Sequence, residues 1–273
     1  MSTGTANRLD PTRFAGQRAL VTGASRGIGA GIAKRLAAEG ADVAIVARTL
    51  DHHPTLPGSL RATAGEMAVH GGRVVPIVAD LSDPSDRSRI VPEAVDGLGG
   101  DIDILVNNAA AALYHSLADY PLRRLRVTFA INVEAPLELA QAVLPGMRAA
   151  GQGWIVNLSS ATARLRPGPP FTTGASSRMA VYGASKAALN RLTNALADEL
   201  WGEGIRVNTV EPRAAVMTEG ATALLGSLPD EQVESLDEMV EAAVALCDCA
   251  PERTGQVVVS LDLLAELGRS VRQ

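Results

Sequence analysis

The chain is poor in aromatic residues and in cysteine. Phe, Trp and Tyr make up 3% of its 273 residues, so a core or a binding wall must be built mainly from aliphatic side chains. The two cysteines, Cys247 and Cys249, form a Cys-x-Cys pair with no third or fourth metal ligand nearby. This spacing disfavours both a mutual disulfide and a zinc site, so we expect no metal and a reducing cytoplasm.

The chain also lacks a strong charge of either sign and a long apolar run. Its formal net charge is −5 and it has no basic run, which argues against a nucleic-acid partner. No stretch approaches the length of a membrane span, and the polar N-terminus has no signal-peptide core. We expect residues 1–13 to be a flexible tail and residues 14–273 to form one domain that binds no membrane.

Apolar strand-like runs alternate with helical patterns along this domain. We predict strands at 18–22, 42–47, 74–79, 102–106, 154–158, 205–210 and 256–260, and helices at about 28–37, 122–149, 181–201 and 236–247. Seven strands alternating with helices predict an α/β, doubly wound Rossmann fold with a parallel sheet flanked by helices. Segments 49–58, 164–179 and 212–230 are interpreted as insertions.

A glycine-rich turn follows the first predicted strand. Segment 22–29 reads TGASRGIG and leads into an amphipathic helix and a second strand, which completes a βαβ unit. Glycines let the backbone approach phosphates, and a helix N-terminus directs free N–H groups at them. The turn therefore predicts a dinucleotide site, with the spacing G-x-x-x-G-x-G rather than G-x-G-x-x-G.

The end of the second strand distinguishes the two nicotinamide cofactors. An acid there would select NAD through the ribose 2′-hydroxyl, but the chain has Arg48 and no acid. Arg48 and Arg26 could both face a 2′-phosphate, for which the planar guanidinium group is a good partner. We predict that the cofactor is NADP, with NAD as the alternative. The other interpretation of Arg26 and Arg48 is that both are solvated surface charges. His52 and His53, just beyond, are interpreted as a solvated loop.

Tyr182 and Lys186 form the candidate catalytic pair. Their spacing of four residues places phenol and ammonium side by side on a helix, and a nearby cation favours the ionised phenol. Ser160 follows the predicted strand 154–158, where its hydroxyl can donate to a carbonyl oxygen. Asn132 lies in an apolar helical run and needs buried hydrogen-bond partners.

The order of TGASRGIG, NNAA, the Asn132 helix, LSS and YGASK resembles the short-chain dehydrogenase/reductase family over roughly residues 14–261. The resemblance implies that Tyr182 moves the proton, and that Lys186 lowers the pKa of Tyr182 and holds the nicotinamide ribose. It also implies that Ser160, with Ser159 as the alternative, positions the substrate oxygen. Asn132 would anchor a water of the proton relay. It also implies that Asp80 contacts adenine and that Asn107 stabilises the sheet and the cofactor. The full set of implied cofactor contacts is Gly23, Ser25, Arg26, Gly27, Ile28, Gly29, Arg48, Asp80, Leu81, Asn107, Tyr182, Lys186, Pro212 and Thr218.

The chain departs from the family pattern at several places. NNAA replaces NNAG, the gap between Ser160 and Tyr182 is longer than usual, Pro212-Arg213 replaces Pro-Gly, and the usual Asp-Gly-Gly near the C-terminus is replaced by 260–262, SLD. The long segment after Arg48 resembles a hydroxysteroid-dehydrogenase-like subgroup, a label that fixes no substrate.

The resemblance also implies assembly, because the helices that carry Asn132 and Tyr182 pair with their symmetry mates in relatives. The apolar residues that we expect at such a homodimer or homotetramer interface are Leu137, Leu139, Val143, Leu189, Leu192 and Leu196.

The predicted function is an oxidoreductase that interconverts a secondary alcohol and a ketone of a small-molecule substrate. We expect an aliphatic substrate wall with a basic edge, built from 113–115, 164–171 and 216–225, with 164–179 as a lid. Two alternatives remain: a dinucleotide-sensing protein with little turnover, and an enoyl reductase that acts on a carbon–carbon double bond.

Overall fold

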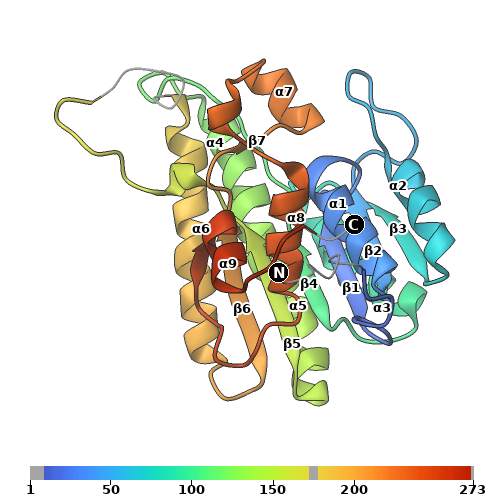
Figure 1. Cartoon of the computed structure of the whole chain (residues 1–273). Coiled ribbons are helices and arrows are strands. Elements are labelled where there is room, and N and C mark those ends of the chain that lie inside the picture. The colour runs from blue at the N-terminus through green and yellow to red at the C-terminus, as the bar shows by residue number, and fades with distance from the viewer. Residues whose placement is uncertain (1–8, 172–177, 272–273) are drawn as a thin grey trace, which may run out of the picture.

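The computed structural model describes residues 9–171 and 178–271, and its centre is a parallel sheet (Figure 1). The strands of this sheet are β1 (Arg18–Thr22), β2 (Asp42–Ala47), β3 (Val74–Val78), β4 (Ile104–Asn107), β5 (Gly153–Leu158), β6 (Ile205–Glu211) and β9 (Val257–Val259). Their order is β3-β2-β1-β4-β5-β6-β9, and every neighbouring pair is parallel. The chain therefore winds outward from β1 in both directions, which confirms the predicted doubly wound, seven-stranded fold.

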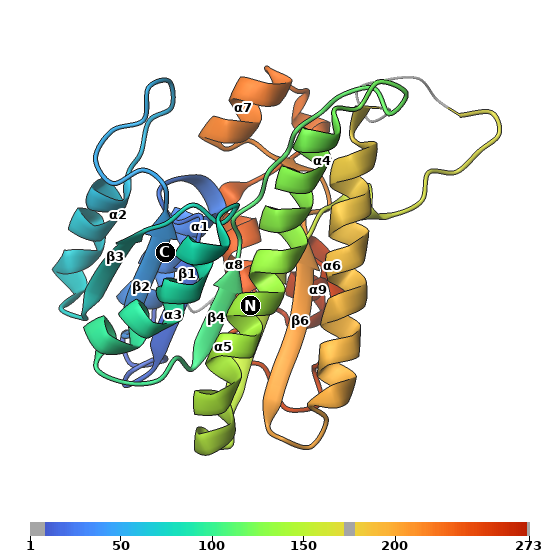
Figure 2. The same ribbon diagram turned by 180° about the vertical axis from the view of Figure 1, so that it is seen from behind.

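Helices cover both faces of the sheet, as the two opposite views show (Figures 1 and 2). One face carries α1 (Gly27–Ala38), α2 (Leu60–Met67), α8 (Leu236–Ala245) and α9 (Ser260–Glu266). The other carries α3 (Pro84–Leu98), α4 (Leu122–Phe129), the π-helical η2 (Ala130–Glu134), α5 (Ala135–Ala150) and α6 (Ala180–Glu199). Short turns are η1 (Ala68–His70), η3 (Ala161–Ala163) and η5 (Asp230–Gln232).

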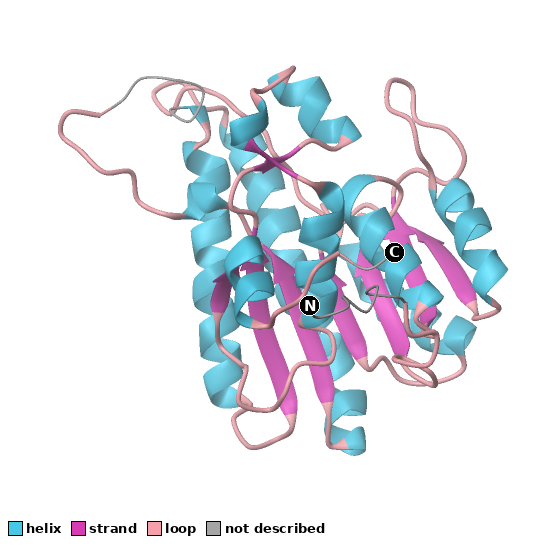
Figure 3. Cartoon of the chain, viewed as in Figure 1, coloured by secondary structure: helices cyan, strands magenta, loops and turns pink. Residues whose placement is uncertain are grey.

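The segment 212–230 is folded rather than a plain insertion. It contains β7 (Ala215–Val216) and α7 (Glu219–Leu225), and β7 pairs with β8 (Val233–Glu234) in a small second sheet (Figure 3). The hydroxyl of Thr218 caps α7 by accepting from Ala221 N at 3.2 Å. The sequence did not reveal α7, because a helix of 7 residues is too short to show an apolar periodicity.

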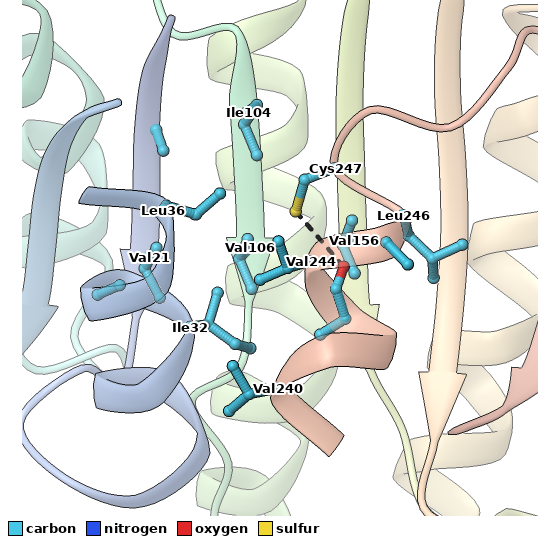
Figure 4. Packing of buried hydrophobic residues seen from close by; sticks show 14 of the residues in the cluster. Val21, Ile32, Leu36, Ile104, Val106, Val156, Val240, Val244, Leu246 and Cys247 are labelled. Carbon is cyan, nitrogen blue, oxygen red and sulfur yellow. Dashed lines mark hydrogen bonds between the residues drawn. The ribbon is translucent and has the colours of Figure 1, made fainter. Parts of the chain in front are cut away.

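Aliphatic side chains fill the layers between helices and sheet, as the low aromatic content requires. Alternate residues of each strand serve opposite faces, so Leu20 packs under α3 and α5, whereas Val21 packs under α1 and α8. Figure 4 shows Val21 and Val106 beside Ile32 of α1 and Val244 of α8. Cys247 lies in the same layer.

Both cysteines are buried free thiols. The thiol of Cys247 donates to Ala243 O at 3.5 Å (Figure 4). Burial raises the pKa of Cys249 to about 11 and raises that of Cys247 further, so both thiols stay protonated near neutral pH.

The helical segments α4, η2 and α5 are continuous, in agreement with the predicted helix 122–149, but their combined length corrects the expectation that no stretch approaches the length of a membrane span. The combined helix Leu122–Ala150 has 29 residues and is long and apolar enough, by length and composition, to cross a membrane. Its α5 part places Leu139, Val143 and Met147 against the sheet, where each is at most 3% exposed. Part of the apolar character of this helix therefore comes from residues that face the core of the domain.

Buried charges tie the N-terminal segment to the domain. Arg13, the last residue of the expected tail, pairs with Glu39 at 2.8 Å and with Asp248 at 2.7 Å. Glu39 is fully buried at the end of α1, where Arg35 also approaches it at 3.5 Å. A buried carboxylate needs such partners, because removing one leaves its charge poorly compensated.

We therefore expect Arg13→Ala to lower the free energy of unfolding by about 2–3 kcal/mol, since Glu39 keeps only part of its compensation. Urea unfolding of the variant and of wild type measures the difference. Thr12→Ala, at an exposed neighbouring position, is the control and should change stability by less than about 0.5 kcal/mol. Equal stability of both variants would contradict a structural role for Arg13.

Candidate active site

A continuous cleft runs beyond the carboxyl ends of the central strands, where ligands bind in open α/β sheets. It consists of two cavities of about 580 and 490 Å³. The two share the lining residues Asn108, Ala110, Ala112, Gly220 and Leu224. Volumes of this size are typical of cofactor and small-molecule sites.

The cleft gathers most of the residues named from the sequence. The larger cavity is lined by Gly23, Ser25, Arg26, Arg48, Asp80 and Leu81. The smaller is lined by Ile28, Ser160, Tyr182, Lys186, Pro212 and Thr218. Four predicted residues, Gly27, Gly29, Asn107 and Asn132, are absent from both linings. The larger cavity thus adjoins the glycine-rich turn, and the smaller holds the candidate catalytic pair.

Close packing explains two of the glycines in the turn. A Cβ at Gly29 would lie 2.3 Å from Asn108 Nδ2, and one at Gly23 would lie 2.7 Å from the same atom. Asn108 Nδ2 donates to Thr22 O at 2.9 Å and to Gly23 O at 3.3 Å. The glycines therefore serve the contact between the turn and the end of β4, which the motif alone did not reveal.

The N-terminus of α1 faces this turn without a side-chain cap. Among the described residues no side chain bonds its first N–H groups, and segment 27–30 carries no acid. Free N–H groups at a helix N-terminus bind anions. This end of the cleft therefore fits a phosphate group.

Asn107 faces away from the cleft, and this corrects part of its expected role. It is 3% exposed, and its Nδ2 donates to Asn157 Oδ1 at 2.9 Å. Asn157 Nδ2 in turn donates to Thr193 Oγ1 of α6 at 2.9 Å. Asn107 thus joins the neighbouring strands β4 and β5 through its side chain, whereas Asn108 lines the cleft. The reason is strand geometry, because successive side chains point to opposite faces.

Tyr182, Lys186 and Ser160 come together from two elements. Tyr182 and Lys186 lie on the first turns of α6, and Lys186 Nζ is 5.8 Å from the Tyr182 ring centroid. Ser160 follows β5, caps η3 and lies close enough to Tyr182 to act on the pKa of its phenol. Ser159 lines the same cavity, and the effect on the phenol supports Ser160 as the serine of the site. Phenol, ammonium and hydroxyl all border the smaller cavity.

Burial sets the protonation of this pair. It raises the pKa of Tyr182, the neighbouring Tyr114 raises it further, and the Ser160 hydrogen bond opposes the shift. The Lys186 ammonium donates to Leu158 O at 2.6 Å, and burial lowers its own pKa to about 8. At neutral pH the phenol is therefore protonated, which suits a proton donor.

Asn132 is fully buried in η2 and bonds protein groups with its whole amide. Its Oδ1 accepts from Ala111 N at 2.8 Å, and its Nδ2 donates to Ala111 O at 3.2 Å and to Ser185 Oγ at 2.9 Å. The amide thus ties the segment after β4 to α6, one residue before Lys186. Its effect on the site is to position these two elements.

The insertion between Ser160 and α6 lines the cleft through Met179 at its end, whereas its residues 164–171 do not border it. Its first residues extend away from the body of the molecule in both views (Figures 1 and 2), and Leu165 is 97% exposed. Arg164 is held by the buried carboxylate of Glu211. The expectation of a wall from 164–171 was therefore wrong, and residues 172–177 lie outside the described residues. The apolar wall is formed by Tyr114, Met179, Val216, Leu224 and Leu225.

Two departures from the family pattern contact each other. Arg213, which replaces the usual glycine, forms an ion pair with Asp262 of the altered C-terminal segment. Arg213 N also donates to Ser260 Oγ at 3.3 Å and to Glu234 Oε2 at 2.7 Å. Contacts between two departures from the family pattern therefore tie the altered loop beside the smaller cavity to α9.

The fold and the cleft are those of a nucleotide-binding α/β protein, and comparison with known proteins identifies the family. The model of the short chain dehydrogenase family matches residues 17–225, so the chain belongs to this family. Hydroxysteroid dehydrogenase-like protein 2 of Xenopus tropicalis is 35% identical over 256 residues, which cover 94% of this chain and 59% of the frog protein. The human protein of that name is 33% identical with the same coverage. The chain thus spans about three fifths of these relatives.

Solved structures resemble the chain over more of their length. A short chain dehydrogenase from Mycobacterium thermoresistibile has a TM-score of 0.82 and 32% identity, with 94% of this chain and 89% of that one covered. A short chain dehydrogenase from Burkholderia cenocepacia, solved with NADP, has a TM-score of 0.75 and 34% identity, with 90% and 97% covered.

The buried ammonium of Lys186 gives a stability prediction. Its pKa falls from 10.5 to about 8 on folding, and each unit is worth about 1.4 kcal/mol. Lys186→Met should therefore raise the free energy of unfolding at pH 7 by about 2 kcal/mol, after the lost hydrogen bond to Leu158 O is deducted.

The sign follows from proton binding. Between pH 8 and 10.5 the unfolded lysine keeps its proton and the folded one loses it, so wild type becomes more stable relative to the variant as pH rises. Urea unfolding of both proteins without cofactor, at pH 7 and above pH 10, measures this. A variant that is less stable than wild type at pH 7 would contradict a net cost of burying the charge.

Proposed function

We propose that the chain is an NADP-preferring oxidoreductase that interconverts a secondary alcohol and a ketone. The observation that carries the proposal is the assembly of Ser160, Tyr182 and Lys186 on one wall of a cleft that continues to an uncapped helix N-terminus. A proton donor and a dinucleotide-sized groove are the two parts that such a reaction needs.

The cleft fits a nicotinamide dinucleotide along its length. Gly23, Ser25 and the N-terminus of α1 would hold the pyrophosphate, and Asp80 and Leu81 would lie at the adenine end. Pro212 and Thr218 border the other end, next to Lys186, which would hold the nicotinamide ribose. When bound, this cofactor would supply or accept the hydride.

The residues of the chain would manage the proton and the orientation of substrate. Tyr182, kept protonated by burial, would donate its phenolic proton to the developing alkoxide, and Ser160 would donate a second hydrogen bond to the same oxygen. Lys186, positioned by Leu158 O, would stabilise the phenolate that remains. Asn132 would hold the segment after β4 and α6 in place around this pair.

The substrate would be a medium-sized apolar carbonyl compound or alcohol. Tyr114, Met179 and Val216 offer an apolar wall, and Tyr114 meets the Tyr182 ring edge-on with centroids 6.0 Å apart. Arg164 is engaged with Glu211 and does not line this cavity. A basic edge at Arg164 therefore forms no part of the proposal.

Two alternative functions differ from this one in what they need. An enoyl reductase adds hydride and proton to a carbon–carbon double bond, and a sensing protein binds the dinucleotide without turnover. A serine hydroxyl beside the Tyr182 phenol in the same cavity favours carbonyl chemistry over the first, because both groups can donate to one carbonyl oxygen. The fastening of Arg213 to Asp262 favours an ordered nicotinamide end over the second.

Tyr182→Phe should abolish ketone reduction by NADPH and leave NADPH binding within about twofold of wild type, because only the transferred proton is lost. Turnover of a ketone panel and cofactor fluorescence titration measure the two effects. An enoyl panel with the same proteins distinguishes the reductase alternative. Ketone turnover by the phenylalanine variant would rule out Tyr182 as the proton donor, and binding without turnover in wild type would support the sensing protein.

We also propose that the protein is cytoplasmic and assembles through α5 and α6. Of the six apolar residues expected at an interface, Leu139, Val143 and Leu189 are buried in the chain itself, which corrects that part of the expectation. Leu137, Leu192 and Leu196 are only half-buried and line a groove between the two helices. Self-complementary apolar faces commonly close as two-fold assemblies.

Light scattering at about micromolar concentration should accordingly give a mass two or four times 28.3 kDa, because a second copy would cover this groove. Leu192→Glu should shift the mass toward the monomer, since it places a charge in the groove. A wild-type mass of 28.3 kDa would contradict assembly.

A further inference from the structure

The segment between β2 and α2 brings a histidine into the cofactor cleft. His53 lines the 580 Å³ cavity together with Ser25, Arg48 and Asp80. It is half-buried, whereas its neighbour His52 is exposed and does not line the cavity. The sequence suggested a solvated loop for both, so the structure separates two adjacent residues of the same type.

The segment is docked on the glycine-rich turn rather than free. Arg26 Nε donates to Pro57 O at 2.7 Å, and its Nη2 donates to Gly58 O at 2.9 Å. Gly58 has φ +87° and sits so close that a Cβ would lie 2.6 Å from Ser25 O. Arg61 and Asp51 pair across the base of the segment. The guanidinium of Arg26, expected to meet a 2′-phosphate, thus holds this segment in place.

The docked segment also fixes the His53 ring. Its Nδ1 accepts from Thr55 N at 3.2 Å and from Leu56 N at 3.1 Å. A neutral imidazole that accepts at one nitrogen carries its hydrogen on the other. Nε2–H is therefore a donor on a ring that borders the cavity.

The charges at this end of the cleft suit a phosphate with more than one donor. Arg48 lies 69% exposed, and its Nη1 is 3.9 Å from Asp80 Oδ2, too far for a hydrogen bond. Arg26 and Arg48 both line the cavity, but Arg26 directs its Nε and Nη2 at the segment, which leaves Arg48 as the better-placed charged donor, with His53 beside it. Phosphate oxygens accept several hydrogen bonds, and those to charged acceptors are the stronger ones.

We propose that His53 is a specificity-determining residue that donates from Nε2 to the 2′-phosphate of NADP, beside Arg48. The proposal rests on the NADP preference proposed above. Through Arg26 and Gly58 the position of the donor is coupled to the glycine-rich turn, so the same segment that closes over the turn presents the group that distinguishes NADP from NAD.

Two substitutions separate the donor from the fold of the segment. His53→Asn keeps an acceptor near the place of Nδ1 for Thr55 N and Leu56 N but has no group at Nε2. His53→Gln can place an amide N–H near Nε2 but loses the acceptor near Nδ1. His52→Asn, at the exposed neighbour, is the matched control, and Arg48→Ala removes the neighbouring charge. Dissociation constants of NADPH and NADH, measured by fluorescence titration of the full chain, are the readout.

We expect wild type and His52→Asn to bind NADPH more tightly than NADH. His53→Asn should weaken NADPH about tenfold and NADH less than twofold, whereas His53→Gln should keep NADPH within about threefold of wild type. Arg48→Ala should weaken NADPH about tenfold or more, again without a matching loss for NADH.

The remaining outcomes overturn different statements. Wild type that binds the two cofactors equally would overturn the NADP preference, and this inference with it. Wild type that prefers NADPH while His53→Asn keeps the full preference would overturn the role of His53 alone. An equal loss for both cofactors in His53→Asn would show that the ring only holds the segment, and it too would overturn the proposal.

Discussion

The contact between the glycine-rich turn and the end of β4 is the constraint on which the rest of the site depends. Asn108 bonds the carbonyls of Thr22 and Gly23, and the hydroxyl of Thr22 accepts from Asn108 N and Ala109 N, both at 3.1 Å. Neither Gly23 nor Gly29 could carry a side chain there. Because β1 and β4 are neighbours from which the chain winds in opposite directions, this contact joins the two halves of the cleft. The cavities on either side of Asn108 are continuous for that reason.

Across the cleft, a second constraint is the burial of charge. Lys186 is 2% exposed and Glu211 is also 2% exposed, so each needs a partner supplied by another element. Leu158 O serves the first and Arg164 the second. Burial also raises the pKa of Tyr182, so the same environment that makes the ammonium costly keeps the phenol protonated. The proposed proton-donating site would thus be held at some expense of stability, as is common where function requires buried polar groups.

Much of the fold and the outline of the site could be predicted, because both depend on short-range patterns. Strand 42–47 and helix 236–247 were placed within two residues of β2 and α8, since apolar periodicity reports which face of an element is buried. The spacing of Tyr182 and Lys186 located the pair on one helix turn. The partners of the arginines could not be predicted, because Arg26 bonds Pro57 O, Arg164 meets Glu211 and Arg213 meets Asp262. Those partners are about 30 to 50 residues away along the chain, and no local pattern specifies a contact of that range.

The sequence by itself determined the parallel α/β sheet, its winding and the family, because periodicity, glycine spacing and motif order are properties of neighbouring residues. Only the tertiary structure decided which of two adjacent residues faces the cleft: Asn108 rather than Asn107, and His53 rather than His52. It also decided that Arg26 fastens a segment and that the part of the insertion starting at Arg164 extends outward. The physical reason is that a side chain's direction and charge partners are set by strand geometry and by elements distant in sequence, which meet only when the chain is folded.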